Sequence, residues 1–201
     1  TTFLADIARN VAGDRAAVES LLPVGVDPHA YQEAPTDVAK IAESNVLILN
    51  GVEYEHFIEP LLENAGGERL IIEATTGLTP HEMEEHGHEG EEHTEGDEHA
   101  HEAGDPHMWL DPNLVITYVE NIRDGLSEAD PEGAETYKAN ADAYIAQLKD
   151  LDKWISEQVD TIPAERRLLV TNHEALGYFA ERYGFEVVDT IIPSLSSEAS
   201  A

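Results

Sequence analysis

Hydrophobic residues recur every three or four positions over several parts of the 201-residue chain. This spacing places apolar side chains on one face of a helix, and it predicts helices over 3–11, 35–42 and 57–62. A fourth stretch, over 111–126, opens with Asp-Pro, a pair typical of a helix N-cap followed by the first helical residue. These amphipathic helices need partners that cover their apolar faces.

Short apolar runs bounded by turn residues alternate with these helices. The runs over 46–49 and 69–72 predict two strands, the first of them fully buried. The runs over 168–170 and 187–192 predict two more near the end of the chain, and 18–22 is a further candidate strand. Strands that alternate with helices are typical of βαβ units around a parallel sheet, so the predicted fold class is α/β.

One helical pattern is much longer than the others. Apolar residues continue at helical spacing from Tyr137 to Ile162, and Pro163 ends the stripe. With the Asp-Pro pair at its start, the pattern predicts a single helix over 130–163, about 30 residues and about 45 Å long. A helix of this length crosses between lobes or forms a coiled pair.

The order of these elements predicts two lobes. The first is expected over 1–129 and includes a His/Glu-rich loop at 81–105, the long helix over 130–163 is the linker, and a second α/β lobe begins at 164–201. The strands predicted at 168–170 and 187–192, with one helix between them, cannot bury a core alone. We therefore expect the second lobe to be incomplete in this chain.

The composition narrows the function classes. The chain has 42 Asp+Glu against 11 Lys+Arg, a formal net charge of −31, which excludes nucleic acid as a partner because phosphate binding needs a basic surface. No apolar run approaches the length of a membrane-spanning helix. Cysteine is absent, so His, Asp and Glu are the side chains left for metal chemistry.

Much of the charge lies in one tract. Residues 81–107 contain nine Glu, two Asp, seven His and no Lys or Arg. A sequence of this composition cannot offset its ordering entropy, so we expect a mobile loop. Its histidines predict an auxiliary, low-affinity metal-collecting arm made of His81, His86, His88, His93, His99 and His101. The alternative is a merely solvated acidic loop.

Three histidines differ from the others in their surroundings. His29 and His107 each end an Asp-Pro-His tripeptide, in which proline stiffens the loop and the aspartate can orient the second ring nitrogen. His173 directly follows a predicted strand, at the sheet edge where open α/β proteins bind ligands. These are the candidate metal ligands, and the alternative for each is an ordinary surface histidine.

Signatures of catalysis are missing from the sequence. His81-Glu82 and His88-Glu89 are each followed by a histidine five residues after the first one rather than four, which misses the metalloprotease spacing. The sequence contains no GxSxG, P-loop or GxGxxG motif. We therefore expect a protein that is not an enzyme, without catalytic or cofactor-binding residues.

Four stretches together carry a family resemblance. They are LPVGVDPHAY at 22–31, AESNVLILNG at 42–51, DPHMWLDP at 105–112 and TNHEALGYF at 171–179. With them the chain resembles the zinc/manganese solute-binding proteins of ABC importers, the cluster A-I substrate-binding family. The resemblance covers nearly the whole chain outside the acidic loop. It implies a bilobal fold in which the long helix is the rigid connection between parallel-sheet lobes.

The resemblance also implies a ligand set. His29 and His107 become metal ligands from the first lobe and His173 a ligand from the second. In such proteins the fourth ligand is usually an aspartate late in the second lobe, which would lie beyond Ala201. In the manganese branch of the family a glutamate occupies the position of His173, so the resemblance favours the zinc branch.

Ligand chemistry and resemblance together predict the function. Three imidazoles suit Zn(II), whereas Mn(II), the alternative cargo, favours oxygen ligands. We expect a monomer that captures Zn(II) outside the cytoplasm and delivers it to an ABC permease in the membrane, with a lipid anchor on a removed N-terminal segment left open. The alternatives are a metal-sequestering or adhesion protein, Mn(II) transport and, least favoured, a zinc-dependent hydrolase.

Overall fold

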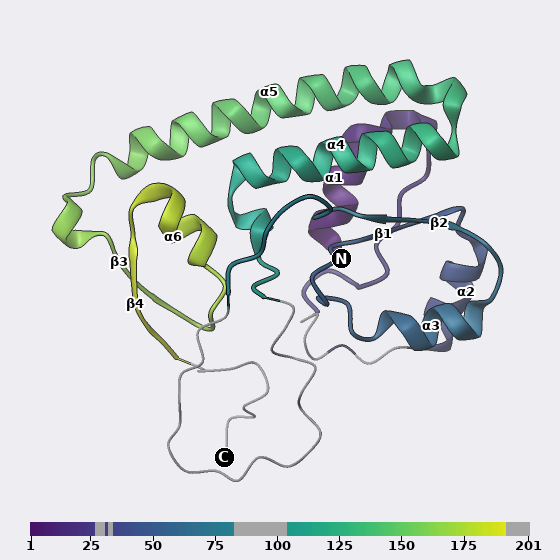
Figure 1. Cartoon of the computed structure of the whole chain (residues 1–201), viewed down its shortest axis with the longest axis horizontal. Coiled ribbons are helices and arrows are strands. Elements are labelled where there is room, and N and C mark those ends of the chain that lie inside the picture. The colour runs from purple at the N-terminus through teal and green to yellow at the C-terminus, as the bar shows by residue number, and fades with distance from the viewer. Residues whose placement is uncertain (27–30, 32–33, 83–103, 192–201) are drawn as a thin grey trace, which may run out of the picture.

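The computed structural model describes residues 1–26, 31, 34–82 and 104–191 (Figure 1). The elements follow one another as α1 (Thr2–Ala12), α2 (Pro35–Glu43), β1 (Val46–Leu49), α3 (Ile58–Ala65), β2 (Leu70–Glu73), α4 (Pro112–Ala129), α5 (Ala134–Val159), β3 (Leu168–Thr171), α6 (Gly177–Tyr183) and β4 (Glu186–Thr190). Short 3-10 turns lie at 13–15, 108–110, 131–133 and 164–166. In the described part of the chain, no helix is both long enough and apolar enough to cross a membrane.

Two parallel strand pairs form at opposite ends of the long helices (Figure 1). β1 pairs with β2 in a register that runs from Val46 opposite Leu70 to Leu49 opposite Glu73. β3 pairs with β4 in the same parallel sense, with a register shift after Leu169. In each pair a helix connects the strands, α3 in the first and α6 in the second. The predicted α/β class with parallel βαβ units is therefore confirmed.

Helix α5 spans the distance between the two strand pairs (Figure 1). It lies along α4 and α1 and then continues past the start of α4 towards α6. The arrangement is that of two sheet-containing lobes along one long helix, as the fold class predicts. The lobe boundaries at 129 and 163 stay a prediction.

The predicted helix over 130–163 is shorter in the structure. Its start, 131–133, forms a 3-10 turn, and regular α-helix runs over the 26 residues Ala134–Val159. Beyond Val159 the chain continues as a turn, in which the N–H groups of Thr161 and Ile162 donate to carbonyls three residues back at 3.1 and 2.9 Å, and Pro163 follows this turn. At the other end, Asp130 accepts hydrogen bonds from Arg15 (2.5 and 2.8 Å) and from the Tyr137 hydroxyl (2.7 Å). The Arg15 guanidinium lowers the pKa of this carboxyl, which stays ionised and joins the loop after α1 to α5.

Two strand predictions need correction. Residues 18–22 form no strand, because side chains occupy their carbonyl groups: Arg9 donates to the carbonyl of Val18 and the Ser20 hydroxyl donates to that of Leu22. The strand at 46–49 forms as predicted, but all four residues are only partly buried. Its sheet has a single neighbouring strand in the described structure, so its outer side is less covered than that of a central strand.

The main core lies where α1, α4 and α5 meet β2. Tyr118, Val119 and Ile122 on α4 are fully buried together with Val11 of α1 and Ala141 of α5. Burial of such apolar surface contributes about 25 cal/mol per Å². This core fixes α4, and α4 in turn fixes the turn that precedes it.

Gly125 is where α4 approaches β2 most closely. A Cβ atom at this position would lie 2.2 Å from Cδ1 and 2.5 Å from Cγ1 of Ile72. Ile72 is itself buried in the main core, so it has little room to move. Only glycine allows this helix-to-strand distance.

We expect Gly125→Ala to lower the free energy of unfolding by about 1–3 kcal/mol, the usual cost of overpacking a core. Chemical denaturation monitored by circular dichroism measures this difference. Glu128→Ala, an exposed change one turn further along α4, is the matched control and should leave the free energy nearly unchanged. Equal stability of Gly125→Ala and the control would contradict the close packing of α4 on β2.

Candidate metal site

Polar and aromatic residues gather where the first strand of each pair ends. Asn50 follows β1, His173 follows β3 by two residues, and the 105–107 segment leads into the turn before α4. The rings of His107 and His173 have centroids 5.4 Å apart, tilted by 55°. The structure thus brings together two of the three predicted ligands, one from each lobe. The third, His29, lies outside the described residues.

The side chain of His107 is oriented by its own tripeptide. Asp105 Oδ1 lies 2.6 Å from His107 Nδ1 and also accepts the backbone N–H of His107 at 2.9 Å. A carboxylate can only accept, so the ring proton is on Nδ1 and Nε2 carries the lone pair that a metal ion needs. The role expected for an aspartate in the Asp-Pro-His sequence is therefore present in the geometry.

Aromatic rings enclose the His107 imidazole, which is 4% exposed. Trp109 is tilted against it at a centroid distance of 5.1 Å, and Tyr54 meets it edge-on at 6.3 Å. Phe3 of α1 stacks on Trp109 at 4.1 Å and holds that indole in place. This apolar surround restricts the imidazole to few orientations.

Asn50 connects this histidine loop to the first sheet. Its side chain is fully buried, donates to the carbonyl of Pro106 (3.2 Å) and accepts from the hydroxyl of Tyr118 on α4 (2.8 Å). The backbone carbonyl of Asn50 accepts a hydrogen bond from the Thr75 hydroxyl at 2.7 Å. In the sequence Asn50 is only one of the turn residues that bound the predicted strand at 46–49, and its positioning role was not predicted. The available signal was a polar residue directly after a strand, at the edge where ligands bind.

A left-handed turn follows Asn50. Gly51, Val52 and Glu53 have φ values of +89°, +54° and +52°, a conformation that is rare for a β-branched residue such as Val52. Glu55 stabilises the turn, because its carboxylate accepts the backbone N–H groups of Asn50 (2.8 Å) and Gly51 (3.3 Å). The turn presents Tyr54 to His107.

His173 is placed by its backbone. The Thr171 hydroxyl at the end of β3 donates to the carbonyl of His173 at 2.8 Å, which curls the chain at the point where the strand ends. Four residues further on, α6 begins at Gly177. The position of α6 therefore constrains where His173 can lie.

One histidine of the predicted auxiliary arm lies in the described structure. His81 stacks on Tyr178 of α6, with ring centroids 3.9 Å apart, and its Nε2 lies 2.8 Å from a carboxylate oxygen of Glu181. The other predicted members, His86, His88, His93, His99 and His101, lie outside the described residues. Across the described ranges, no three His, Asp or Glu side chains are arranged to hold a metal ion. Within the described residues, the candidate site therefore consists of two imidazoles, those of His107 and His173.

Two parallel-sheet lobes whose imidazoles meet at the strand ends form the arrangement expected of a solute-binding protein. The family model of ZnuA, described as zinc-uptake complex component A, periplasmic, matches residues 1–201. The chain therefore belongs to this family. This match confirms the family resemblance. It also confirms the predicted location outside the cytoplasm and the expectation of a binding protein rather than an enzyme.

Curated relatives differ in the metal that they are named for. The chain is 37% identical to the manganese-binding lipoprotein MntA of Halalkalibacterium halodurans, over 93% of this chain and 57% of the relative. It is 37% identical to the iron-binding protein YfeA of Yersinia pestis (93% and 56%) and 36% identical to the zinc-binding lipoprotein AdcA of Streptococcus pneumoniae (99% and 39%). The chain spans about half the length of these relatives. Membership supports metal binding and does not select zinc.

A solved structure agrees with the fold. The crystal structure of ZnuA superposes with a TM-score of 0.81 at 31% identity, over 97% of this chain and 70% of that chain. The described lobes and their long helix thus have the fold of that solved structure.

We expect Asn50→Ala to lower the free energy of unfolding by about 1–3 kcal/mol, because it leaves the buried Pro106 carbonyl and Tyr118 hydroxyl without this partner. Denaturant titration measures the loss. The control is Asn64→Ala, which removes an exposed amide that donates to the Pro60 carbonyl at 2.8 Å. If both variants unfold at the same denaturant concentration, Asn50 does not hold the loop.

Burial raises the pKa of Glu55, although the two backbone donors oppose the shift. A carboxyl with a raised pKa in the folded state stabilises the fold most below its ordinary pKa of 4.5. This contribution is lost as the pH rises through the folded pKa. Glu55→Gln should therefore gain stability relative to the natural chain as the pH increases from 4 to 7. Unfolding free energies of both proteins across this range test the shift, and a constant difference would refute it.

Proposed function

We propose that the chain captures a divalent metal ion, zinc, outside the cytoplasm and delivers it to an ABC-type permease. The observation that carries the proposal is the meeting of His107 and His173, whose ring centroids lie 5.4 Å apart although they come from different lobes. Membership of a family described as a periplasmic zinc-uptake component supports the same function. The protein acts by binding and release.

The proposed ligands are His29, His107 and His173. The oriented ring of His107 supports its assignment, because metal-bound histidines usually donate their second N–H to a carboxylate or carbonyl. His29 ends the same Asp-Pro-His sequence, and His173 lies against His107. A metal ion bound between His107 and His173 would join residues of both lobes.

Zinc is the proposed cargo because neutral imidazoles suit Zn(II) better than Mn(II). Manganese is the second candidate, favoured by the similarity to the manganese-binding MntA. Imidazole must be deprotonated to bind either ion, so affinity falls as the pH drops towards the ligand pKa values. The proposed partner is a membrane permease, and the chain works as a monomer.

The histidines of the acidic tract are proposed to supply metal to the main ligands. A metal ion held loosely by His81, His86, His88, His93, His99 or His101 stays tethered near the main ligands. Tethering raises its effective concentration there. This arm would add weak sites without replacing the tight one.

His107→Ala and His173→Ala should each weaken zinc binding by more than about 100-fold, beyond the 10–100-fold that changes around a ligand usually cost. Zinc titration by calorimetry, with manganese as competitor, measures the loss. His56→Ala is the matched control, since His56 is exposed and lies in neither lobe's site.

Unchanged zinc affinity in both variants would overturn the proposed function. If the natural chain instead binds manganese more tightly than zinc, the proposed uptake function stands and the proposed cargo becomes manganese.

A further inference from the structure

His81 and Asp105, which lie on either side of the 83–103 segment in the sequence, are joined by a backbone hydrogen bond. The backbone N–H of Asp105 donates to the carbonyl of His81 at 2.8 Å. Asp105 is also the residue whose carboxylate orients His107. The base of the acidic tract and the support of the candidate ligand therefore share one residue.

Tyr178 of α6 reaches across to this base. Its hydroxyl donates to the carbonyl of Asp105 at 2.6 Å and accepts the backbone N–H of His81 at 2.9 Å. The ring is buried and stacks on the His81 imidazole with an angle of 18° between the planes. Burial raises the pKa of Tyr178 to about 12, so the hydroxyl keeps its proton and remains a donor at neutral pH.

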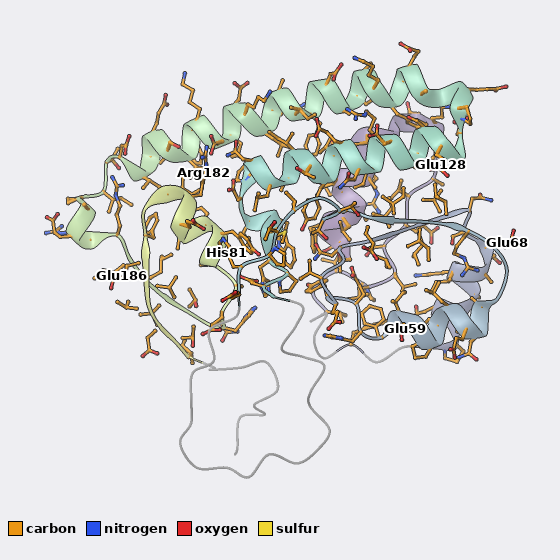
Figure 2. The ribbon with its side chains drawn as sticks, viewed as in Figure 1. Glu59, Glu68, His81, Glu128, Arg182 and Glu186 are labelled. Atoms are coloured by element: carbon orange, nitrogen blue, oxygen red, sulfur yellow. The ribbon has the colours of Figure 1, made fainter. Side chains whose placement is uncertain are left out.

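The far end of α6 is attached to the long helix. Arg182 donates two hydrogen bonds to Asp152 of α5, at 3.0 and 2.7 Å, and the Tyr183 hydroxyl donates to the same carboxylate at 3.0 Å. Figure 2 shows Arg182 pointing towards α5 and His81 beside the other end of α6. The helix that follows His173 is thus held on two sides, by α5 and by Asp105.

We infer that Tyr178 is a positioning residue for the metal site, which links the lobe of His173 to the Asp105–His107 pair through one hydroxyl. The inference rests on the proposed function. Asp105 is bonded through both its main chain and its side chain, to Tyr178 and to His107 respectively. Without the Tyr178 hydroxyl, the Asp105 backbone loses its anchor, the His107 ring is less well oriented, and α6 can shift with His173.

Tyr178→Phe tests the inference, because it removes the hydroxyl and retains the ring that stacks on His81. Tyr183→Phe is the matched control: it makes the same chemical change on the same helix but breaks only a bond to α5. We expect Tyr178→Phe to weaken zinc affinity by about 10–100-fold and Tyr183→Phe to leave it within about twofold of the natural chain. Competition with a chromophoric chelator measures both, and thermal unfolding without metal shows that both variants fold.

Two further measurements separate positioning from general loosening. The visible spectrum of bound Co(II) should change in Tyr178→Phe, because the ligand geometry changes, and should stay the same in Tyr183→Phe. In the Asp105→Asn background, Tyr178→Phe should cost much less than in the natural chain, because its effect passes through Asp105. This coupling would be absent if the hydroxyl only stabilised α6.

Natural zinc affinity and an unchanged cobalt spectrum in Tyr178→Phe, in a chain whose His107→Ala variant has lost its tight site, would overturn this inference alone. Fully additive costs in the double variant would also overturn it. If His107→Ala and His173→Ala bind zinc as the natural chain does, the proposed function fails and this inference fails with it.

Discussion

The burial of one face of α4 determines where the neighbouring helices, the first sheet and the turn before α4 lie. This helix packs on α1, α5 and β2, and its inward residues have no exposure at Tyr118, Val119 and Ile122. Its first turn is fixed by the Asp111 carboxylate, which accepts the N–H of Asn113 at 2.8 Å. The 108–110 turn, which contains Trp109, lies directly before this cap, and His107 directly precedes the turn. The main hydrophobic core therefore sets the position of a polar side chain at its edge.

A chain of hydrogen bonds carries this order from the core to the site. Tyr118 on α4 bonds to Asn50 at the end of β1, Asn50 bonds to the Pro106 carbonyl, and the next residue is His107. From the other lobe, Tyr178 bonds to Asp105. Elements far apart in sequence thus converge on the three residues Asp105–His107. Each link is buried or half-buried, where an unmade bond is costly, so the links favour one arrangement.

Local patterns predicted the elements, and long-range contacts decided what the patterns could not. The helices and parallel strands were predictable from hydrophobic spacing, and His107 and its aspartate were recognisable from the Asp-Pro-His sequence. Asn50 and Tyr178 were missed because their partners lie 56 and 73 residues away in the sequence. Glu55 was missed because hydrophobic spacing does not reveal a side chain that bonds to the backbone five residues earlier. The strand prediction at 18–22 was wrong because the Arg9 side chain of α1 donates to the Val18 carbonyl, which a neighbouring strand would otherwise bind. Three imidazoles favour zinc on chemical grounds, yet relatives named for manganese and iron are just as similar, so the cargo is not readable from ligand type alone.

The turn at 51–53 bears on what the first sheet can bind. Successive N–H groups that converge at a strand end form a nest that attracts anions, and many α/β proteins use such a place for phosphate. Here the nest is filled from within, since the N–H groups of Asn50 and Gly51 already point at the carboxylate of Glu55. A free phosphate or sulfate would have to displace a buried side chain of the same charge. The chain thus supplies its own carboxylate at this edge, and these two N–H groups are already satisfied before any anion arrives.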